Sequence, residues 1–150
     1  MEQSVFKGMA TALVTPMNKG GSIDYPALGR LLEFQIEQGA DALVVMGTTG
    51  EASTLEEREK WELAEFAIHR VDKRVPVIIG TGSNDTRRSA MLSREAQHLG
   101  ADGLLLVTPY YNKTSQEGLI RHFETIADQV SVPVILYNVP TRTGVNICPE

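Results

Sequence analysis

The chain has 150 residues, of which 42% are hydrophobic and 22% are charged, and its formal net charge is −5 at neutral pH. This is the composition of an ordinary globular domain. An acidic chain without a basic run is poorly suited to bind a nucleic-acid backbone. The longest apolar runs are strand-sized, so the sequence predicts no membrane span.

Two features bear on the cellular compartment. Residues 1–7 lack the long apolar core of a signal peptide. Cys148 is the single cysteine, so it has no internal disulfide partner, and such a chain suits a reducing compartment. We therefore expect a cytoplasmic protein.

In chain order, the sequence predicts strands that alternate with helices. The first helix begins after Asp24, a good N-cap, and stops at Gly39. Thr54 and Glu57 have the spacing of a capping box, which opens the second helix. The five predicted strands, all buried, are residues 9–15, 42–46, 75–79, 104–107 and 132–136.

The third helix is predicted to begin at a cap formed by Ser83 or Asn84 and to end at Leu99-Gly100. The fourth has the clearest amphipathic pattern in the chain. Its apolar positions are Leu119, Ile120, Phe123, Ile126, Ala127 and Val130.

Internal repeats indicate the fold class. Residues 39–45 recur as residues 100–106, and residues 75–78 recur as residues 132–135, each time two strand–helix units further on. The strands lack polar/apolar alternation, which is typical of a parallel sheet covered on both faces. No GxGxxG follows the first strand, so a (β/α)₈ barrel fits better than a doubly wound sheet.

The length sets how much of a barrel the chain forms. A complete (β/α)₈ barrel takes about 250 residues. The chain accounts for the first four βα units and the fifth strand, and no linker or low-complexity stretch marks a second domain. We therefore expect residues 1–150 to be the N-terminal part of a single barrel domain.

Polar residues gather where each predicted strand ends. In a (β/α)₈ barrel these positions converge at the C-terminal mouth, where such enzymes keep their active sites. The sequence therefore predicts a functional cleft at this rim. The positions are Thr15, residues 47–50, residues 80–82, residues 108–112 and residues 137–144.

The residue types at the rim favour a particular chemistry. Gly47-Thr48-Thr49-Gly50-Glu51 brings hydroxyls and backbone N–H groups to a helix start, an arrangement that holds an anion. Tyrosine and threonine hydroxyls both donate and accept, so Tyr137 and Thr48 can pass a proton. Arg142 is suited to a carboxylate. The alternatives are a tight turn for the glycines, a core aromatic for Tyr137 and a solvated loop cation for Arg142.

Other reactive side chains have structural interpretations. His69, His98 and His122 fall on helices beside charged residues, so we expect all three at the surface, and Cys148 to be unreactive. No metal-ligand spacing occurs, and no metal site is predicted. A row of acidic residues is expected to be a solvated helix face: Glu56, Glu57, Glu59, Glu62 and Glu65.

Three linked motifs carry a family resemblance over the whole chain. They are Gly47-Thr48-Thr49-Gly50-Glu51, Thr108-Pro109-Tyr110-Tyr111-Asn112 and Tyr137-Asn138-Val139-Pro140-Thr141-Arg142-Thr143-Gly144, in that order and spacing. Together they resemble the dihydrodipicolinate synthase family. N-acetylneuraminate lyases of the same superfamily typically have serine before the threonine of the GxTGE motif and no such arginine. Thr48 and Arg142 therefore favour the synthase.

The resemblance implies a class I aldolase-type lyase of lysine and diaminopimelate biosynthesis. Pyruvate would form a Schiff base with a lysine, become an enamine and add to aspartate semialdehyde, with no other cofactor. The family assembles as a homotetramer, a dimer of dimers.

Site roles follow position by position from the same resemblance. Tyr137, Thr48 and Tyr111 match the proton relay, with Tyr137 as general acid/base and Tyr111 reaching into a neighbouring subunit's site. Thr49 with Gly47 matches the cradle for the pyruvate carboxylate. Arg142 matches the residue that binds the semialdehyde carboxylate.

The Schiff-base lysine is implied on the sixth strand, beyond Glu150. Such a lysine needs a pKa depressed by desolvation or by a cationic neighbour. The five lysines of this chain lie on turns, helix faces or strand approaches, so the 150 residues alone are expected to be incompetent for the chemistry. They are Lys7, Lys19, Lys60, Lys73 and Lys113.

The resemblance also implies an altered feedback site for lysine. Lysine-sensitive members carry histidine, histidine and glutamate where this chain has Glu57, Lys60 and Arg88. Two positions that would receive a cationic effector are themselves cationic, so we expect weak or absent inhibition. The remaining positions of this site are Ala52, Asn84 and Tyr110.

Two other interpretations stay open from the sequence. One is a sister lyase that acts on another 2-oxo acid or sugar acid, such as N-acetylneuraminate. The other is a non-catalytic half-barrel that serves as a folding or assembly module.

Overall fold

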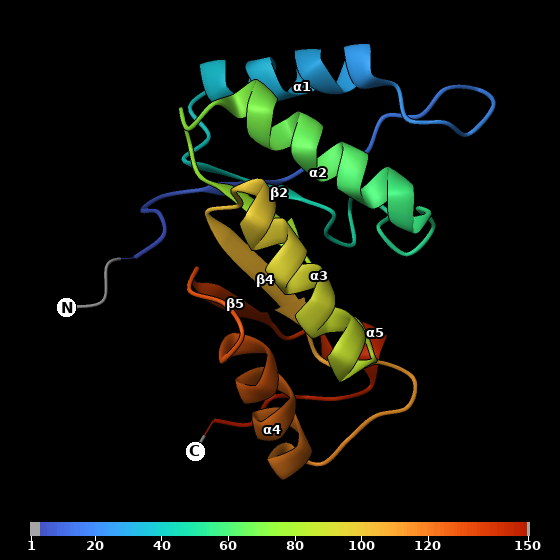
Figure 1. Ribbon diagram of the computed structural model, residues 1–150, viewed down its shortest axis with the longest axis vertical. Helices are drawn as coiled ribbons and strands as arrows, with labels where there is room; N and C mark the ends of the chain where they lie inside the picture. Colours follow the sequence, from blue (N-terminus) through green and yellow to red (C-terminus); the bar gives the residue numbers. More distant parts are fainter. Residues whose placement is uncertain (1–3, 150) are drawn as a thin grey trace.

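The computed structural model describes residues 4–149, so residues 1–3 of the N-terminal segment discussed above lie outside it. Five parallel strands form one curled sheet and alternate with helices that follow one another along one face of it (Figure 1). The elements are β1 (Ala10–Ala12), α1 (Tyr25–Glu37), β2 (Ala42–Val45), α2 (Glu57–Val71), β3 (Val77–Gly80), α3 (Thr86–Leu99), β4 (Gly103–Val107), α4 (Gln116–Ala127), β5 (Val134–Tyr137) and α5 (Pro140–Thr143).

The strand order confirms the predicted fold class. Each strand pairs in parallel with the next one in the sequence, in the order β1-β2-β3-β4-β5. In a doubly wound sheet the order of the strands reverses at a switch point, whereas here the order follows the sequence throughout. Five strands in progressive order form half of a (β/α)₈ barrel.

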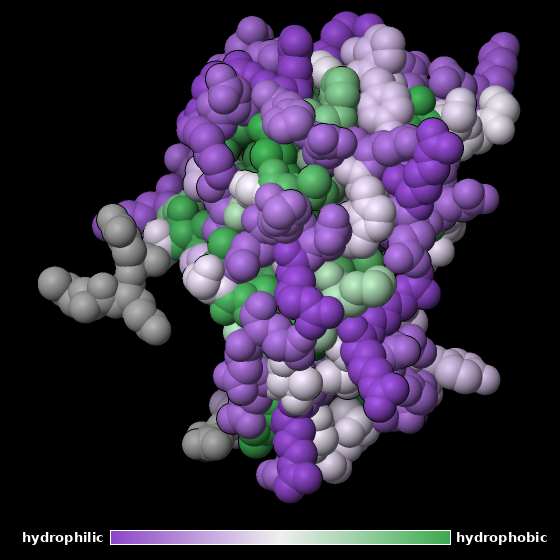
Figure 2. Space-filling model, viewed as in Figure 1, coloured by the Kyte–Doolittle hydropathy of each residue, from purple (hydrophilic) through white to green (hydrophobic). Residues whose placement is uncertain are grey.

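Most of the core lies between the helices and the outer face of the sheet. Leu43 and Val45 of β2 point into it and meet Leu32 of α1 and Leu63 of α2. A second cluster lies beneath α4, around Phe123. Hydrophilic residues cover most of the helical side, and hydrophobic ones show in patches between them (Figure 2).

The opposite face of the sheet is also apolar. Ala42 and Val44 of β2 and Ile78 of β3 form a small cluster there, against which Leu105 and Ile135 pack partly buried. Because both faces carry apolar residues, these strands show no alternation with polar residues, as the sequence pattern indicated.

The first strand is shorter and less buried than predicted. It covers three residues, and the flanking Met9 and Val14 are 59% and 52% exposed. β1 lies at the edge of the sheet and pairs only with β2. Its other edge therefore has no neighbouring strand within residues 4–149. Leu13, whose N–H donates to the carbonyl of Val44 at 2.9 Å, is buried.

The other strands keep their predicted places with shifted ends. β3 and β5 each begin two residues later than expected, after Pro76 and Pro133. A proline has no N–H to donate to the sheet, which excludes it from the regular ladder. The stretch after Tyr137, expected as a loop, contains the single helical turn α5.

The predicted caps of the second and third helices were wrong. The second is capped by Glu56, whose N–H donates to the carboxylate of Glu59 at 2.9 Å, whereas the Thr54 hydroxyl donates to the Glu51 carbonyl in the preceding turn. Leu55, directly before this cap, is buried.

The cap of α3 is Asp85, whose side chain accepts from the N–H groups of Arg87 and Arg88. Neither expected cap, Ser83 or Asn84, has this role, and Ser83 is buried and bonds to Ser89 instead. The predicted end of this helix at Leu99-Gly100 is confirmed.

The expectation that His122 lies at the surface was also wrong. Its side chain is 5% exposed on the inner face of α4, and its Nδ1 lies 2.9 Å from the Thr86 hydroxyl of α3. Ile120 and Ala127, expected on that face, are exposed. His69 and His98 are exposed, as predicted. Within residues 4–149, no helix has both the length and the apolar character needed to cross a membrane.

Candidate functional site

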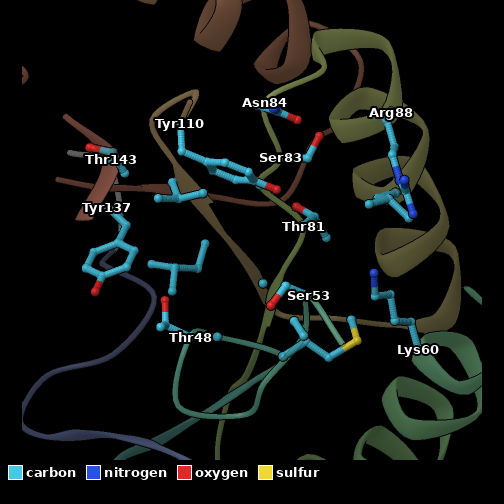
Figure 3. A pocket seen from close by; sticks show the side chains of 18 of the residues that line it. Thr48, Ser53, Lys60, Thr81, Ser83, Asn84, Arg88, Tyr110, Tyr137 and Thr143 are labelled. Carbon is cyan, nitrogen blue, oxygen red and sulfur yellow. The ribbon is translucent and has the colours of Figure 1, made fainter. Parts of the chain in front are cut away.

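A cavity of about 550 Å³ opens at the C-terminal ends of β2 to β5, within the size range of small-molecule sites. Residues that follow each of these strands line it, together with the first turns of α2 and α3 (Figure 3). The lining residues are Met46, Gly47, Thr48, Ala52, Ser53, Lys60, Trp61, Gly80, Thr81, Gly82, Ser83, Asn84, Asp85, Arg88, Leu92, Leu105, Val107, Tyr110, Tyr137, Val139, Arg142 and Thr143.

Two glycines allow the strand ends to approach one another at the floor of this cavity. A Cβ on Gly80 would collide with the carbonyl of Met46, and one on Gly82 would collide with the backbone of Val107. Backbone atoms cannot move aside as a flexible side chain can. Glycine is therefore required where β3 meets the ends of its neighbours.

The turn after β2 is held from below by Thr15. The buried Thr15 hydroxyl donates to the Gly50 carbonyl at 2.7 Å, and the Gly50 N–H donates to the Gly47 carbonyl at 3.1 Å. Thr15 was expected at the rim of the cleft, but it does not line the cavity. It positions the turn, which presents Thr48 to the cavity and leaves Thr49 exposed outside the lining.

β5 and the turn after it supply the next part of the wall. Tyr137 ends β5 and is half-buried, and Arg142 is exposed on α5. The Thr143 hydroxyl donates to the Val145 carbonyl at 3.0 Å and fixes α5 to the segment that follows. Thr48 and Tyr137 lie on one side of the cavity, across from Lys60 and Arg88 (Figure 3).

The two tyrosines after β4 are placed differently. Tyr110 lines the cavity, whereas Tyr111 is 92% exposed and outside the lining. Tyr111 has φ +67°, in the left-handed region, a conformation that costs of the order of 1 kcal/mol or more for such a residue. Thr108, also expected at the rim, is fully buried beneath the surface.

Buried hydroxyl groups support the cavity wall where α3 begins. Thr81 was expected at the rim within residues 80–82, whereas Ser83, Ser89 and Ser93 were not foreseen as part of the site. Thr81 lies 2.9 Å from Ser93, and Ser83 lies 3.0 Å from Ser89, oxygen to oxygen. All four residues are buried, so these bonds tie the end of β3 to α3. The signal was present in the sequence, because Ser89 and Ser93 are small polar residues one helical turn apart on the side of α3 that packs inward.

The far end of the cavity is cationic. Burial lowers the pKa of Lys60, and the charge of Arg88 lowers it further, while Glu57 opposes this effect. Arg88 lies 3.9 Å from the carboxylate of Glu57, a long ion pair at the surface. Of the six predicted feedback positions, the lining includes Ala52, Lys60, Asn84, Arg88 and Tyr110, and Glu57 stands just outside it.

Metal-binding groups do not gather in the described part of the chain. Residues 4–149 contain no cluster of three or more histidine, cysteine, aspartate or glutamate side chains that would hold a metal ion. Cys148 is exposed.

The fold and this strand-end cavity define a chain of the (β/α)₈-barrel class with a small-molecule site at the barrel mouth. Residues 5–150 match the model of the dihydrodipicolinate synthetase family. The chain belongs to this family, which confirms the resemblance stated from its motifs.

Relatives with assigned names agree with the family. The chain is 56% identical over 147 residues to the 4-hydroxy-tetrahydrodipicolinate synthase of Caldicellulosiruptor bescii, over 98% of this chain and 50% of that protein. It is 58% identical over 146 residues to the enzyme of the same name from Geobacter metallireducens, over 97% and 50%. The chain therefore spans about half the length of the curated relatives it matches.

Solved structures give the same picture. The chloride inhibited dihydrodipicolinate synthase from Acinetobacter baumannii, complexed with pyruvate, matches with a TM-score of 0.93 and 50% identity, over 96% of this chain and 49% of that one. A prophage protein of the dihydrodipicolinic acid synthase family from E. coli K12, in complex with pyruvate, matches with a TM-score of 0.93 and 42% identity, over 96% and 48%.

Proposed function

We propose that this chain supplies half of the active site of a lyase that condenses pyruvate with aspartate semialdehyde to give 4-hydroxy-tetrahydrodipicolinate. The observation that carries the proposal is that Thr48, Tyr137 and Arg142 line one cavity at the strand ends. The names of the relatives and the pyruvate in two related structures support the substrate class. Such an enzyme belongs to lysine and diaminopimelate biosynthesis and works in the cytoplasm.

The reaction divides into steps in which these residues have distinct tasks. A lysine amine adds to the pyruvate carbonyl and releases water, which forms the imine. Loss of a methyl proton gives the enamine, whose carbon attacks the aldehyde carbon of the second substrate. The amine of the semialdehyde then adds to the imine carbon, which closes the ring and releases the lysine amine. Tyr137 moves protons in these steps, and Thr48 passes them on through its hydroxyl. The reaction is proposed to need no cofactor, because the Schiff base between the lysine and pyruvate activates the substrate.

Charge recognition falls to other groups. The turn after β2 is proposed to receive the pyruvate carboxylate, with Gly47 in the cavity lining and the Thr49 hydroxyl just outside it. Arg142 receives the carboxylate of the semialdehyde at the exposed edge of the cavity. Tyr111 projects away from its own cavity, so its contribution is made to the site of a second copy, within a dimer of a homotetramer.

The Schiff-base lysine is proposed to come from outside these 150 residues. Lys7, Lys19, Lys73 and Lys113 are exposed, and none of them lines the cavity. Lys60 is half-buried, but it lies on α2 across the cavity from Tyr137 (Figure 3). The chain alone should therefore form no Schiff base with pyruvate.

Reduction with borohydride in the presence of pyruvate tests this directly. Mass spectrometry should show no covalent adduct on the 150-residue chain alone. The chain mixed with the C-terminal half of the Geobacter metallireducens relative should restore both the adduct, on that half, and condensation activity. The matched control is Tyr137→Phe in the same mixture, which should co-elute with its partner and lose activity by about 10²-fold or more. An adduct on the 150-residue chain alone would contradict the proposal.

A second candidate function differs only in the acceptor. The prophage protein of E. coli K12 has the same fold and a bound pyruvate, so pyruvate binding in this family does not fix the second substrate. A panel of aldehydes and sugar acids on the complemented site separates the candidates. Aspartate semialdehyde should be preferred, and the preference should disappear in Arg142→Gln if the arginine binds its carboxylate.

A further inference from the structure

The end of the cavity between α2 and α3 has a chemistry of its own. Four residues form what we call the cationic end: Ser53, Lys60, Asn84 and Arg88. Lys60 and Arg88 point toward one another from the two helices, on the side away from Thr48 and Tyr137 (Figure 3). A ligand held here would therefore sit apart from the reacting atoms of the proposed reaction.

The positive charge at this end is only partly offset by close ion pairs within residues 4–149. Among residues 4–149, Lys60 forms no ion pair, and Arg88 has only the long, surface contact with Glu57. Asp85 is the one carboxylate among the lining residues, and its oxygen already accepts from the N–H groups of Arg87 and Arg88. Two cations thus face the same space, with the carboxylate of Asp85 in the lining and that of Glu57 just outside it.

Neutral donors stand beside the two cations. Among the described residues, the side-chain amide of Asn84 and the hydroxyl of Ser53 have no hydrogen-bond partner. The side chain of Asn112 donates to Asn84, but to its backbone carbonyl. Arginine offers a planar fork that matches an oxyanion, and lysine adds a compact charge. Charged and neutral donors therefore face one volume together.

We propose that the cationic end binds a small oxyanion with two negative charges, a dicarboxylate or a phosphate. The inference goes beyond the proposed reaction and does not depend on it, since all four residues lie in α2, α3 and the turns before them. Burial lowers the pKa of Lys60 and the charge of Arg88 lowers it further, and a bound anion would relieve this repulsion between the two cations. A cationic ligand would add to that repulsion.

The test is a titration of the 150-residue chain with inorganic phosphate, and separately with succinate, at constant ionic strength. Heat of binding and amide NMR shifts are followed together. We expect saturable binding of at least one anion, with shifts at Ser53 and Asn84. Lys60→Gln and Arg88→Gln should each weaken the affinity about tenfold or more, because each removes one charge-assisted contact.

Arg87→Gln is the matched control. Arg87 is exposed on the same helix, next to Arg88, and does not line the cavity. Its replacement should leave the affinity within about twofold. Equal weakening by Arg87→Gln, or no saturable binding of either anion, would overturn the proposal. If Lys60→Gln does not fold, Arg88→Gln decides, because Arg88 is exposed at the surface. Saturation by only one of the two anions identifies the ligand class.

Discussion

Asp41 and Asp102 make the same hydrogen bond at two places in the sheet. The carboxylate of Asp41 accepts from the Met9 N–H at 2.7 Å, and that of Asp102 accepts from the Val77 N–H at 3.0 Å. Each aspartate stands just before one strand and holds the start of the preceding strand. The Gly-Ala-Asp repeat in the sequence therefore provides the same side-chain hydrogen bond between neighbouring strands at two places.

The other two residues of the repeat have matching tasks. Gly39 and Gly100 adopt positive φ values of 85° and 100°, where the helices before them end. Ala40 and Ala101 are both buried, and the N–H of each donates at 3.0 Å to a carbonyl in the last turn of its helix. Glycine is favoured at such helix ends because it lacks a Cβ.

Replacement of Asp102 by alanine should lower the free energy of unfolding by about 1–3 kcal/mol. The change removes the acceptor of the Val77 N–H and also the ion pair with Lys73. Urea denaturation measures the loss. The control is Asp128→Ala. Asp128 is exposed, so this substitution should change the free energy of unfolding by less than about 0.5 kcal/mol.

Gly80→Ala should destabilise the chain by more than about 2 kcal/mol. The new methyl group would meet the carbonyl of Met46, which belongs to the backbone and cannot rotate away. Gly20→Ala is the control, because nothing lies within 4 Å of a Cβ there. Thermal denaturation of both variants decides the point, and equal melting temperatures would show that the strand ends can separate.

Thr15→Val should loosen the turn that carries Thr48 and Thr49. The buried hydroxyl that donates to Gly50 is lost, and the Gly50 carbonyl is left without its partner, at a cost of about 1–2 kcal/mol. Hydrogen exchange should quicken at residues 47–51. Thr15→Ser, which keeps the hydroxyl, should preserve the slow exchange.

The buried histidine of α4 makes stability depend on pH. Burial lowers the pKa of His122, so its folded-state pKa lies below the value near 6.5 of the unfolded chain. As the pH falls, His122 takes up a proton at a higher pH in the unfolded state than in the folded state. Stability is therefore lost as the pH falls from about 7 through 6.5 toward the folded pKa. Unfolding curves at several pH values should show this loss in the natural chain.

Two variants isolate the contribution of His122. His122→Gln should remove part of the pH dependence between pH 7 and 5. His98→Gln, at an exposed position on α3, should keep it. A pH profile identical in all three proteins would contradict the assignment.

Lysine should be a poor ligand of the cavity. Lys60 and Arg88 repel its ammonium group, so no saturable response is expected at sub-millimolar lysine in the complemented enzyme. The double variant Lys60→His and Arg88→Glu should gain a response, because it introduces the histidine and glutamate that the family resemblance implies for lysine-sensitive members. Clear inhibition of the unchanged enzyme by sub-millimolar lysine would refute the prediction.

Local sequence patterns predicted what depends on local chemistry. The parallel strands, the Asp24 cap and the end of α3 follow from apolar runs, an Asx cap and glycine, each readable within a few residues. The family motifs placed Thr48, Tyr137 and Arg142 near one another because strand ends of a parallel sheet meet at one edge.

What failed depends on contacts distant in sequence. His122 is buried against the neighbouring helix, where its Nδ1 contacts the Thr86 hydroxyl. No sequence pattern around residue 122 reveals this contact. Several polar residues stand near the caps Glu56 and Asp85, so a local pattern does not single out the residue that caps, and the neighbouring Leu55 and Ser83 are buried. Whether a strand-end hydroxyl reaches the cavity, as Thr48 does, or lies beneath it, as Thr15 does, depends on the turn geometry.

The progressive strand order has a consequence for how the protein folds. Each strand pairs only with the next one along the chain, so every pairing closes over a single intervening helix. The paired residues lie about 30 positions apart, as Ala10 and Ala42 do, so each closure costs less entropy than a pairing that skips a strand. During synthesis on the ribosome, β1 and β2 can pair before β4 and β5 have been translated. The sheet is thus arranged to grow strand by strand from its N-terminal edge.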